Sequence, residues 1–128
     1  VLHVNLSERE MFLSKINQCS NPRGKIYIED FYQKNNFTEK ENRDLDRIVS
    51  CPGLPTREDY ICTLKKTGFD VNFKDITEEW TDFVAARAKE YAQSELPSPS
   101  LQNFYQTISN LFRGNNLGGV RITAVMAA

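Results

Sequence analysis

The sequence predicts a single-domain α/β layer fold. Apolar residues recur at helical spacing in five segments and at alternating spacing in three, and the two kinds of segment are interleaved along the chain. The expected order is helix, strand, helix, helix, strand, helix, helix, strand. A chain of 128 residues fits one domain and can bury about two thirds of the surface that its unfolded state exposes.

The first expected element is a helix. Ser7 stands three residues before Glu10, which is the spacing of a capping box, and an apolar stripe follows. The stripe comprises Phe12, Leu13, Ile16 and Cys19. A break at NPRG then leads to residues 25–31, where Ile26 and Ile28 alternate with Lys25, Tyr27 and Glu29. This alternation predicts a strand.

Two short helices with recognisable ends follow. Thr38 with Glu41 has the spacing of a second capping box, and Thr56 can cap the helix after the CPGLP break. Gly68 stands where a left-handed residue is wanted at the end of that helix. The expected apolar faces are Leu45, Ile48 and Val49 in the first helix, and Tyr60, Ile61 and Leu64 in the second.

The last third of the chain predicts a strand, two helices and a strand. Period two returns at Phe69, Val71 and Phe73, and Thr77 opens the longest helix, which ends near Ser94. Its apolar stripe comprises Trp80, Phe83, Val84, Ala88 and Tyr91. After ELPSPS another helix carries Leu101, Phe104, Tyr105, Ile108, Leu111 and Phe112 on one side. The final strand is expected at residues 120–126.

The glycine-rich stretch GNNLGG stands directly before that final strand. Both the dinucleotide fingerprint and the P-loop place a strand before the glycines and a helix after them. Because the order is reversed here, the stretch predicts a turn that leads into a strand and not a cradle for phosphate.

Composition narrows the function classes. The chain has 40% apolar and 26% charged residues, and no apolar run approaches the roughly 20 residues that span a bilayer. Sixteen basic and seventeen acidic residues give a net charge of -1, and no dense basic cluster is present. We therefore expect neither a membrane span nor nucleic-acid binding.

The cysteines and the N-terminus bear on location and completeness. Cys19, Cys51 and Cys62 are odd in number and lack paired zinc or redox spacing, so we expect reduced thiols in a cytoplasmic protein and no metal site. The chain opens on Val1 without a basic leader or cleavage site. We expect a chain that is entered partway through a longer protein.

Three motifs in order resemble the C-terminal half of a class I S-adenosylmethionine-dependent methyltransferase. They are LHV before a capped helix, NPRGKIYIEDF as a turn and strand, and LKKTGFDVNFKDIT with GGVRITAVMA as the closing elements. The resemblance implies a Rossmann-like fold containing strands five to seven, with an antiparallel final strand and flanking helices. The resemblance covers nearly the whole chain. We therefore expect residues 1–128 to be the C-terminal part of one methyltransferase domain.

The subgroup that the chain resembles most is that of small-molecule N-methyltransferases acting on phosphoethanolamine, sarcosine or dimethylglycine. Its members carry a Leu-His pair after the fourth strand, and the resemblance places their active-site histidine on His3. An imidazole titrates near neutral pH and can take the proton that an amine loses before methylation. His3 is thus the candidate catalytic residue. The alternative is a histidine that only packs behind a strand.

Asp30, Phe31 and Tyr32 are expected just beyond the C-terminal end of the predicted fifth strand, where α/β sheets bind ligands. We assign them as candidate substrate-binding residues, although an acid and two aromatics are also ordinary loop residues. The resemblance makes Trp80 and Arg87 minor candidates, although the Trp80 stripe is first of all a burial signal.

The phosphoethanolamine enzymes hold phosphate with aromatic residues and an arginine after the fifth strand. The matching positions here are Phe31, Asp46, Ser50 and Pro52. None of them suits a phosphate, so a phosphorylated base is disfavoured and other small acceptors, such as sarcosine-like or sterol-like ones, gain weight.

The cofactor implied for the intact enzyme is S-adenosylmethionine. No Gly-x-Gly turn follows a strand in this chain, so we expect the isolated chain to bind no cofactor and to be inactive.

We also expect self-association or pairing with a missing N-terminal half through the unpaired edge of residues 25–31, bearing Ile26 and Ile28. Two alternatives are a non-catalytic partner-binding or oligomerisation module derived from the same fold and, more remotely, an unrelated α/β ligand-binding domain.

Overall fold

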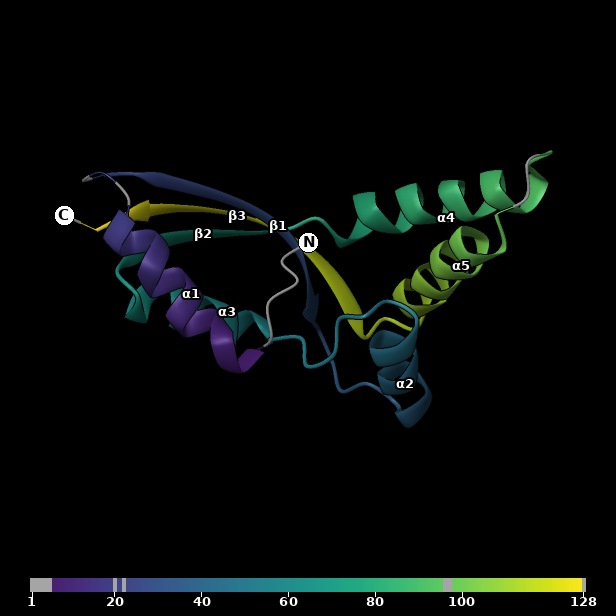
Figure 1. Ribbon diagram of the computed structural model, residues 1–128, viewed down its shortest axis with the longest axis horizontal. Helices are drawn as coiled ribbons and strands as arrows, with labels where there is room; N and C mark the ends of the chain where they lie inside the picture. The colour runs from purple at the N-terminus through teal and green to yellow at the C-terminus, as the bar shows by residue number, and fades with distance from the viewer. Residues whose placement is uncertain (1–5, 20, 22, 96–97, 128) are drawn as a thin grey trace.

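The computed structural model describes residues 6–19, 21, 23–95 and 98–127. Within these residues three strands form one sheet, namely β1 (Lys25–Gln33), β2 (Phe69–Asp75) and β3 (Leu117–Met126). β3 lies in the middle and runs antiparallel to both neighbours, which gives the order β1-β3-β2. The helices are α1 (Leu6–Cys19), α2 (Glu39–Arg47), α3 (Arg57–Lys66), α4 (Thr77–Gln93) and α5 (Pro99–Arg113). This is the expected α/β class and order of elements (Figure 1).

The helix ends confirm the local signals. Thr38 and Glu41 exchange both hydrogen bonds of a capping box at α2, and the Thr56 side chain accepts a hydrogen bond from the Asp59 amide at α3. Gly68 follows α3 with a φ of 95°, a conformation in which a Cβ atom would be strained. The α3-to-β2 connection can therefore be short because glycine occupies that position.

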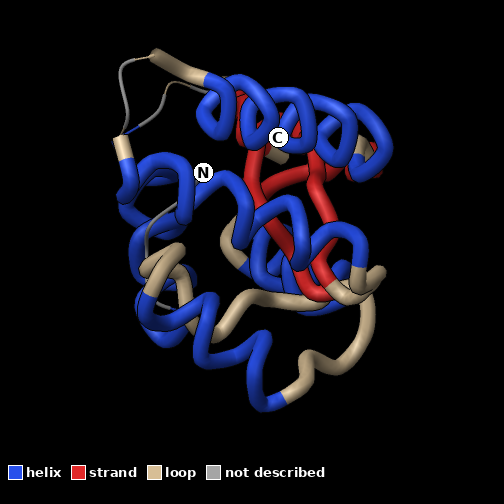
Figure 2. Tube along the Cα trace, turned by 90° about the vertical axis from the view of Figure 1, so that its right-hand side faces the viewer, coloured by secondary structure: helices blue, strands red, loops and turns tan. Residues whose placement is uncertain are grey.

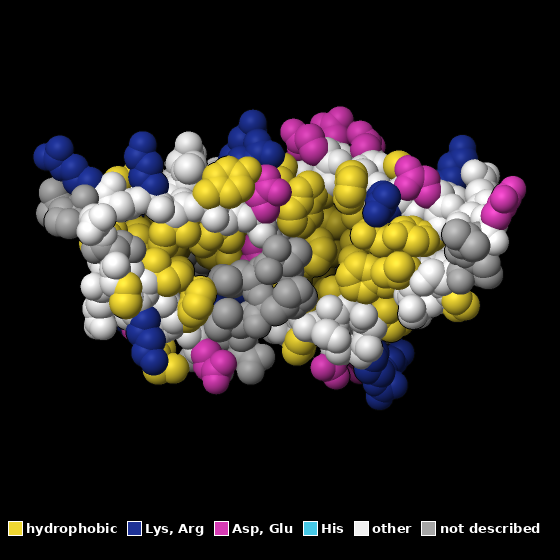
Figure 3. All heavy atoms as spheres, turned by 45° about the horizontal axis from the view of Figure 1, so that its top comes forward, with side chains coloured by type: hydrophobic (Ala, Val, Ile, Leu, Met, Phe, Trp, Pro, Cys, Tyr) yellow, Lys and Arg dark blue, Asp and Glu magenta, His cyan; other side chains and the backbone are white. Residues whose placement is uncertain are grey.

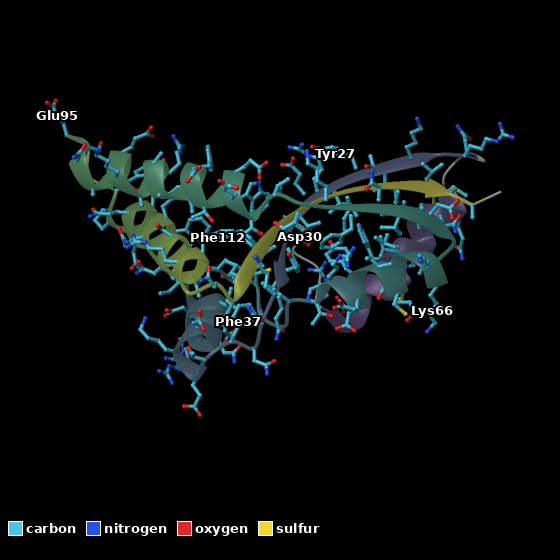
Figure 4. All side chains as sticks on the ribbon, turned by 180° about the vertical axis from the view of Figure 1, so that it is seen from behind. Tyr27, Asp30, Phe37, Lys66, Glu95 and Phe112 are labelled. Carbon is cyan, nitrogen blue, oxygen red and sulfur yellow. The ribbon has the colours of Figure 1, made fainter. Side chains whose placement is uncertain are left out.

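The two faces of the sheet differ because neighbouring side chains of a strand point to opposite sides. On one face Ile28, Val120 and Ile122 are buried beneath α1 and α3, together with Leu13 and Leu64 of these helices. The opposite face carries polar residues toward the start of β1, where the Tyr27 side chain is 61% exposed. Figure 4 shows Tyr27 on the side of the sheet away from α1 and α3.

A second core lies beyond the carboxyl ends of β1 and β2. There α2, α4 and α5 gather around the end of β1 and the start of β3 (Figure 1), and Figure 2 views the molecule from this end. Its buried members include Phe31 and Leu117 from the strands, Leu45 after the α2 cap, and Ile108 and Phe112 from α5. The sheet thus divides the apolar interior into two clusters.

Two expected boundaries and one expected buried face are corrected. α1 already includes Ser7, so this residue is not the cap. Its buried residues include Arg9 and Leu13, whereas Phe12 is 37% exposed and Cys19 is exposed. The expected stripe missed Arg9 because it was drawn from apolar residues alone. β3 begins at Leu117, so Gly118 and Gly119 lie inside the strand and not in a turn.

The edge strand also differs from expectation. Within the described residues β1 pairs along its length with β3 only, so its other edge is open as expected, apart from one bridge between Gln33 and Thr56. However, Ile28 is only 9% exposed and Ile26 is half-buried, because both point toward the layer of α1 and α3. The open edge therefore presents backbone groups and few apolar side chains.

Candidate functional site

A pocket of about 550 Å³ lies at the end of the molecule formed by α2, α4 and α5. It adjoins the carboxyl-terminal half of β1, the end at which open α/β sheets bind ligands. Its apolar lining includes Phe31, Trp80, Phe83, Val84, Phe104 and Ile108. Figure 3 shows hydrophobic side chains gathered on the half of this face that α4 and α5 occupy. Its size and apolar lining make it the candidate site.

Trp80 fixes the inner wall of the pocket. Its ring meets that of Phe31 edge to face, with 5.2 Å between the ring centroids, and both rings contact Phe112. On its other side Trp80 packs on the backbone of β3, where a Cβ atom on Gly119 would lie 2.9 Å from the indole. The absent side chain at Gly119 thus lets Trp80 lie against the central strand.

Gly118 does the same on the opposite face of β3. A Cβ atom there would lie 2.7 Å from Cζ of Tyr32, whose ring crosses the central strand. The Tyr32 hydroxyl donates a hydrogen bond to the Asp75 carboxylate at the end of β2. Asp75 also accepts a 2.8 Å hydrogen bond from the Thr77 amide at the start of α4. This chain of contacts ties both outer strands to the first turn of the helix that carries Trp80.

Arg87 joins α4 to α5 outside the pocket. Its guanidinium lies over the rings of Tyr91 and Tyr105, 5.4 and 5.5 Å from their centroids, and these two rings stack on each other. Glu90 balances its charge at 3.1 Å. Tyr105 also lines the pocket, so Arg87 positions one wall of it.

Two acidic side chains stand at the rim, Glu29 and Glu79. Glu29 accepts hydrogen bonds from the Tyr27 hydroxyl at 2.7 Å and from Nε of Arg121 at 2.9 Å. These two contacts hold the pKa of the Glu29 carboxyl below its ordinary value. Glu79 makes no ion pair with any residue that the structure describes.

The expected substrate-binding trio is divided between the two faces. Asp30, Phe31 and Tyr32 lie within β1, which extends to Gln33, and not beyond its end as expected. Because strand residues alternate, only Phe31 reaches the pocket. Asp30 and Tyr32 point to the side of α1 and α3, so they do not line it.

Asp30 is fully buried in a polar cluster with Arg9 and Tyr60, at the junction of strands and helices (Figure 4). Its Oδ2 accepts hydrogen bonds from Nη1 of Arg9 at 3.0 Å and from the Tyr60 hydroxyl at 2.8 Å. Burial and the nearby Asp30 charge raise the pKa of the Tyr60 hydroxyl, so it remains a donor at neutral pH. The cluster binds α1, β1 and α3 together.

His3, the candidate catalytic residue, lies outside the residues that the structure describes. Trp80, a minor candidate, is half-buried and lines the pocket, while Arg87 stands beside it. Phe83 was expected in the core but is 58% exposed at the pocket, because α4 extends past the sheet (Figure 1).

Sequence reasoning missed the Arg9 and Tyr60 partners of Asp30 and the rim residue Glu79. Arg9 and Tyr60 are 21 and 30 positions from Asp30 in sequence, and no local pattern joins them. The aromatic spacing of Phe104 was recognised, but only as a helix face.

Other kinds of site receive no support in the part of the chain that the structure describes. No group of three or more His, Cys, Asp or Glu side chains is arranged to hold a metal ion there. Among the described helices, none combines the length and the apolar character needed to cross a membrane. Cys19, Cys51 and Cys62 are free, with only Cys51 buried.

Comparisons with known proteins follow the fold. No protein-family model matches the chain, and no curated protein matches it either. Solved structures do match. Phosphoethanolamine N-methyltransferase 2 of Haemonchus contortus, in complex with phosphomonomethylethanolamine and S-adenosylhomocysteine, has a TM-score of 0.79 and 16% identity over 93% of this chain. The match covers 30% of that protein.

Two further structures agree. A protein described as a sarcosine dimethylglycine methyltransferase from Galdieria sulphuraria has a TM-score of 0.79 and 12% identity, over 93% of this chain and 48% of its own. A cyclopropane synthase from Mycobacterium tuberculosis has a TM-score of 0.73 and 14% identity, over 93% of this chain and 50% of its own. The chain therefore spans half or less of these three proteins, and it has the fold of that part of S-adenosylmethionine-dependent methyltransferases.

Proposed function

We propose that this chain is part of an S-adenosylmethionine-dependent methyltransferase that methylates a small-molecule acceptor, most simply an amine. The observation that carries the proposal is the pocket at the carboxyl end of β1, within a fold shared with methyltransferases. The acceptor occupies this pocket, and Phe31 and Trp80 contact it. Asp30 and Tyr32, first assigned to the substrate, do not line the pocket. They fix the strand that carries Phe31 and the helix that carries Trp80.

The cofactor is held by the rest of the intact enzyme. In the described residues the glycines of β3 are covered by Tyr32 on one face and by Trp80 on the other, so their backbone has no room for a nucleotide. These glycines of the described chain thus do not fit the cofactor, which supplies the methyl group from elsewhere. We expect the isolated chain to be inactive.

His3 is proposed to take the proton that the acceptor nitrogen loses. This role rests on its place in the LHV motif and on the pKa range of imidazole. In the intact enzyme, His3→Asn should lower turnover by about ten- to ten-thousand-fold and leave cofactor affinity nearly unchanged. Unaltered turnover would assign His3 to packing.

The test of the proposed function is methyl transfer from radiolabelled S-adenosylmethionine to a panel of primary and secondary amines. The intact parent protein should transfer the label, and calorimetry should detect no binding of S-adenosylmethionine to the 128-residue chain at submillimolar concentration. A parent that neither binds the cofactor nor transfers the label contradicts the proposal. Micromolar binding of S-adenosylmethionine by the isolated chain contradicts the assignment of the cofactor to the rest of the enzyme.

A second candidate is a non-catalytic module that recruits a partner through β1. The open edge of this strand favours it, because unpaired backbone groups accept another strand. The isolated chain should then self-associate, or pair with a separately made N-terminal half, at micromolar concentration in light scattering. A strictly monomeric chain with well-dispersed amide resonances counts against pairing through this edge.

A further inference from the structure

The pocket has a one-sided electrostatic character. Apart from Glu29 and Glu79 its lining is apolar or aromatic, and no Lys or Arg belongs to the lining among the described residues. Arg121 and Arg87, the nearby cations, are each engaged by an acid, namely Glu29 and Glu90. An anionic ligand that moved from water into this pocket would therefore meet no free positive charge. Burying an unpaired charge in an apolar site is costly in free energy.

Glu79 supplies a charge that no ion pair balances among the residues that the structure describes. Glu29 already receives the Tyr27 hydroxyl and the Arg121 guanidinium on one carboxylate oxygen, whereas Glu79 is exposed in the first turn of α4. It stands one residue before Trp80, and both line the pocket. A cation at the rim would thus lie beside a carboxylate and close to aromatic rings, and a carboxylate and the face of an aromatic ring both attract positive charge.

We infer that the acceptor is a hydrophobic amine without an anionic group. Its apolar body, about as large as a substituted benzene ring, lies among Phe31, Trp80 and Phe104, and its ammonium lies at the rim beside Glu79. A volume of about 550 Å³ is within the range of small-molecule sites. This inference rests on the proposed function for the identity of the pocket as the acceptor site, but it concerns a different property, the charge and polarity of the ligand.

The test uses the fluorescence of Trp80, which is the only tryptophan in the sequence and lines the pocket. The full 128-residue chain is titrated at pH 7 with three probes that share one body, namely 4-phenylbutylamine, 4-phenylbutan-1-ol and 4-phenylbutyrate. The amine should bind about three- to tenfold more tightly than the alcohol, and the carboxylate should bind more weakly than the alcohol.

Variants assign the preference to Glu79. Glu79→Gln should bring the ratio of amine to alcohol affinity to within about twofold and leave the alcohol affinity unchanged. Glu78→Gln is the matched control, since Glu78 is also an exposed acid in the first turn of α4 but does not line the pocket. Phe104→Ala should weaken all three probes by a similar factor, because it removes apolar contact and no charge.

Three results would overturn the inference: a carboxylate that binds as tightly as the amine, equal effects of the Glu78 and Glu79 substitutions, or no response to any probe up to millimolar concentration. The titration needs neither cofactor nor turnover. Amine selectivity in a chain whose parent transfers no methyl group therefore keeps the inferred charge preference of the pocket and rejects the proposed function, and with it the identity of the ligand as a methyl acceptor. If the parent methylates amines but the chain does not discriminate among the three probes, the proposed function is supported and this inference is rejected.

Discussion

The two faces of β1 are built for different purposes. Toward α1 and α3 the strand presents Asp30, which is fully buried and hydrogen-bonded to Arg9 and Tyr60. Toward α4 and α5 the next residue, Phe31, packs on Trp80 and lines an open pocket. One residue of sequence thus separates a locked polar core from a candidate ligand site.

This difference shows why a ligand site can be left open here. The α1 and α3 layer, with its ion pair and apolar cluster, anchors β1 and β3, so the opposite side need not be closed to keep the strands in place. Tyr32 and Asp75 carry that anchoring to the first turn of α4. The predictions below weaken the anchor first and then the link between the two sides.

The largest effect is expected at the buried ion pair. Asp30→Asn keeps the size of the side chain but removes the negative charge that faces the guanidinium of Arg9, a residue that is only 4% exposed. Removing one partner of a buried pair costs about 3–5 kcal/mol, so the free energy of unfolding should fall by this amount in urea titrations.

Glu10→Gln is the matched control for that substitution. Glu10 pairs with Lys66 at 3.1 Å, but the two side chains are 53% and 65% exposed. An exposed pair contributes about 1 kcal/mol or less, so this variant should unfold almost as the original chain does. Equal losses in the two variants would mean that burial does not distinguish the pairs.

The next effect concerns the glycines that separate the two faces at β3. Gly118→Ala should force Tyr32 off the strand, and Gly119→Ala should displace Trp80, since each new Cβ atom would lie within 3 Å of a ring atom. Overpacking of this kind costs about 1–3 kcal/mol, measured as a lower free energy of unfolding. Gly119→Ala should also change the Trp80 emission, whereas Gly118→Ala should change it less.

Gly114→Ala tests whether the cost comes from rigid rings. Its Cβ atom would lie 2.8 Å from Oε2 of Glu41, which can turn aside while Oε1 keeps the capping-box hydrogen bond, and its φ of -70° is open to alanine. We expect little loss of stability. A loss as large as that at Gly118 would point to a general intolerance of the glycines and not to the rings.

The sequence was sufficient for the fold class, the order of elements and most helix ends. Thr38, Thr56 and Gly68 act within four residues of their own positions, so their roles are visible in local patterns. The antiparallel direction of the final strand was expected from the family resemblance, and its pairing with both other strands confirms it. Local chemistry and the resemblance were enough for these features.

The site was only partly predictable, because it depends on contacts distant in sequence. The trio from Asp30 to Tyr32 was assigned to one loop, but two further residues of strand place its members on opposite faces. Trp80 was taken as core because helical periodicity does not tell how far a helix extends past the sheet. Gly118 and Gly119 resembled a turn, since the rings that require them come from residues 86 and 39 positions earlier.

The smallest effect, and the sharpest test of the link between the faces, is the pH dependence contributed by Asp75. Partial burial opposes ionisation of this carboxyl, but hydrogen bonds from Thr77 and Tyr32 outweigh it and lower its pKa. A pKa lowered by folding means that the stabilisation is complete above the ordinary aspartate value of about 4 and is lost as the pH falls through the lowered value. Because the side chain is exposed, Asp75→Asn should cost no more than about 1 kcal/mol at pH 7.

Urea midpoints between pH 7 and pH 3 should fall less steeply in Asp75→Asn than in the original chain, while Asp70→Asn, at an exposed position of the same strand, should leave the slope unchanged. Tyr32→Phe, which removes one donor, should give an intermediate slope; if it matches the original chain, the hydrogen bond across Gly118 does not couple the two outer strands.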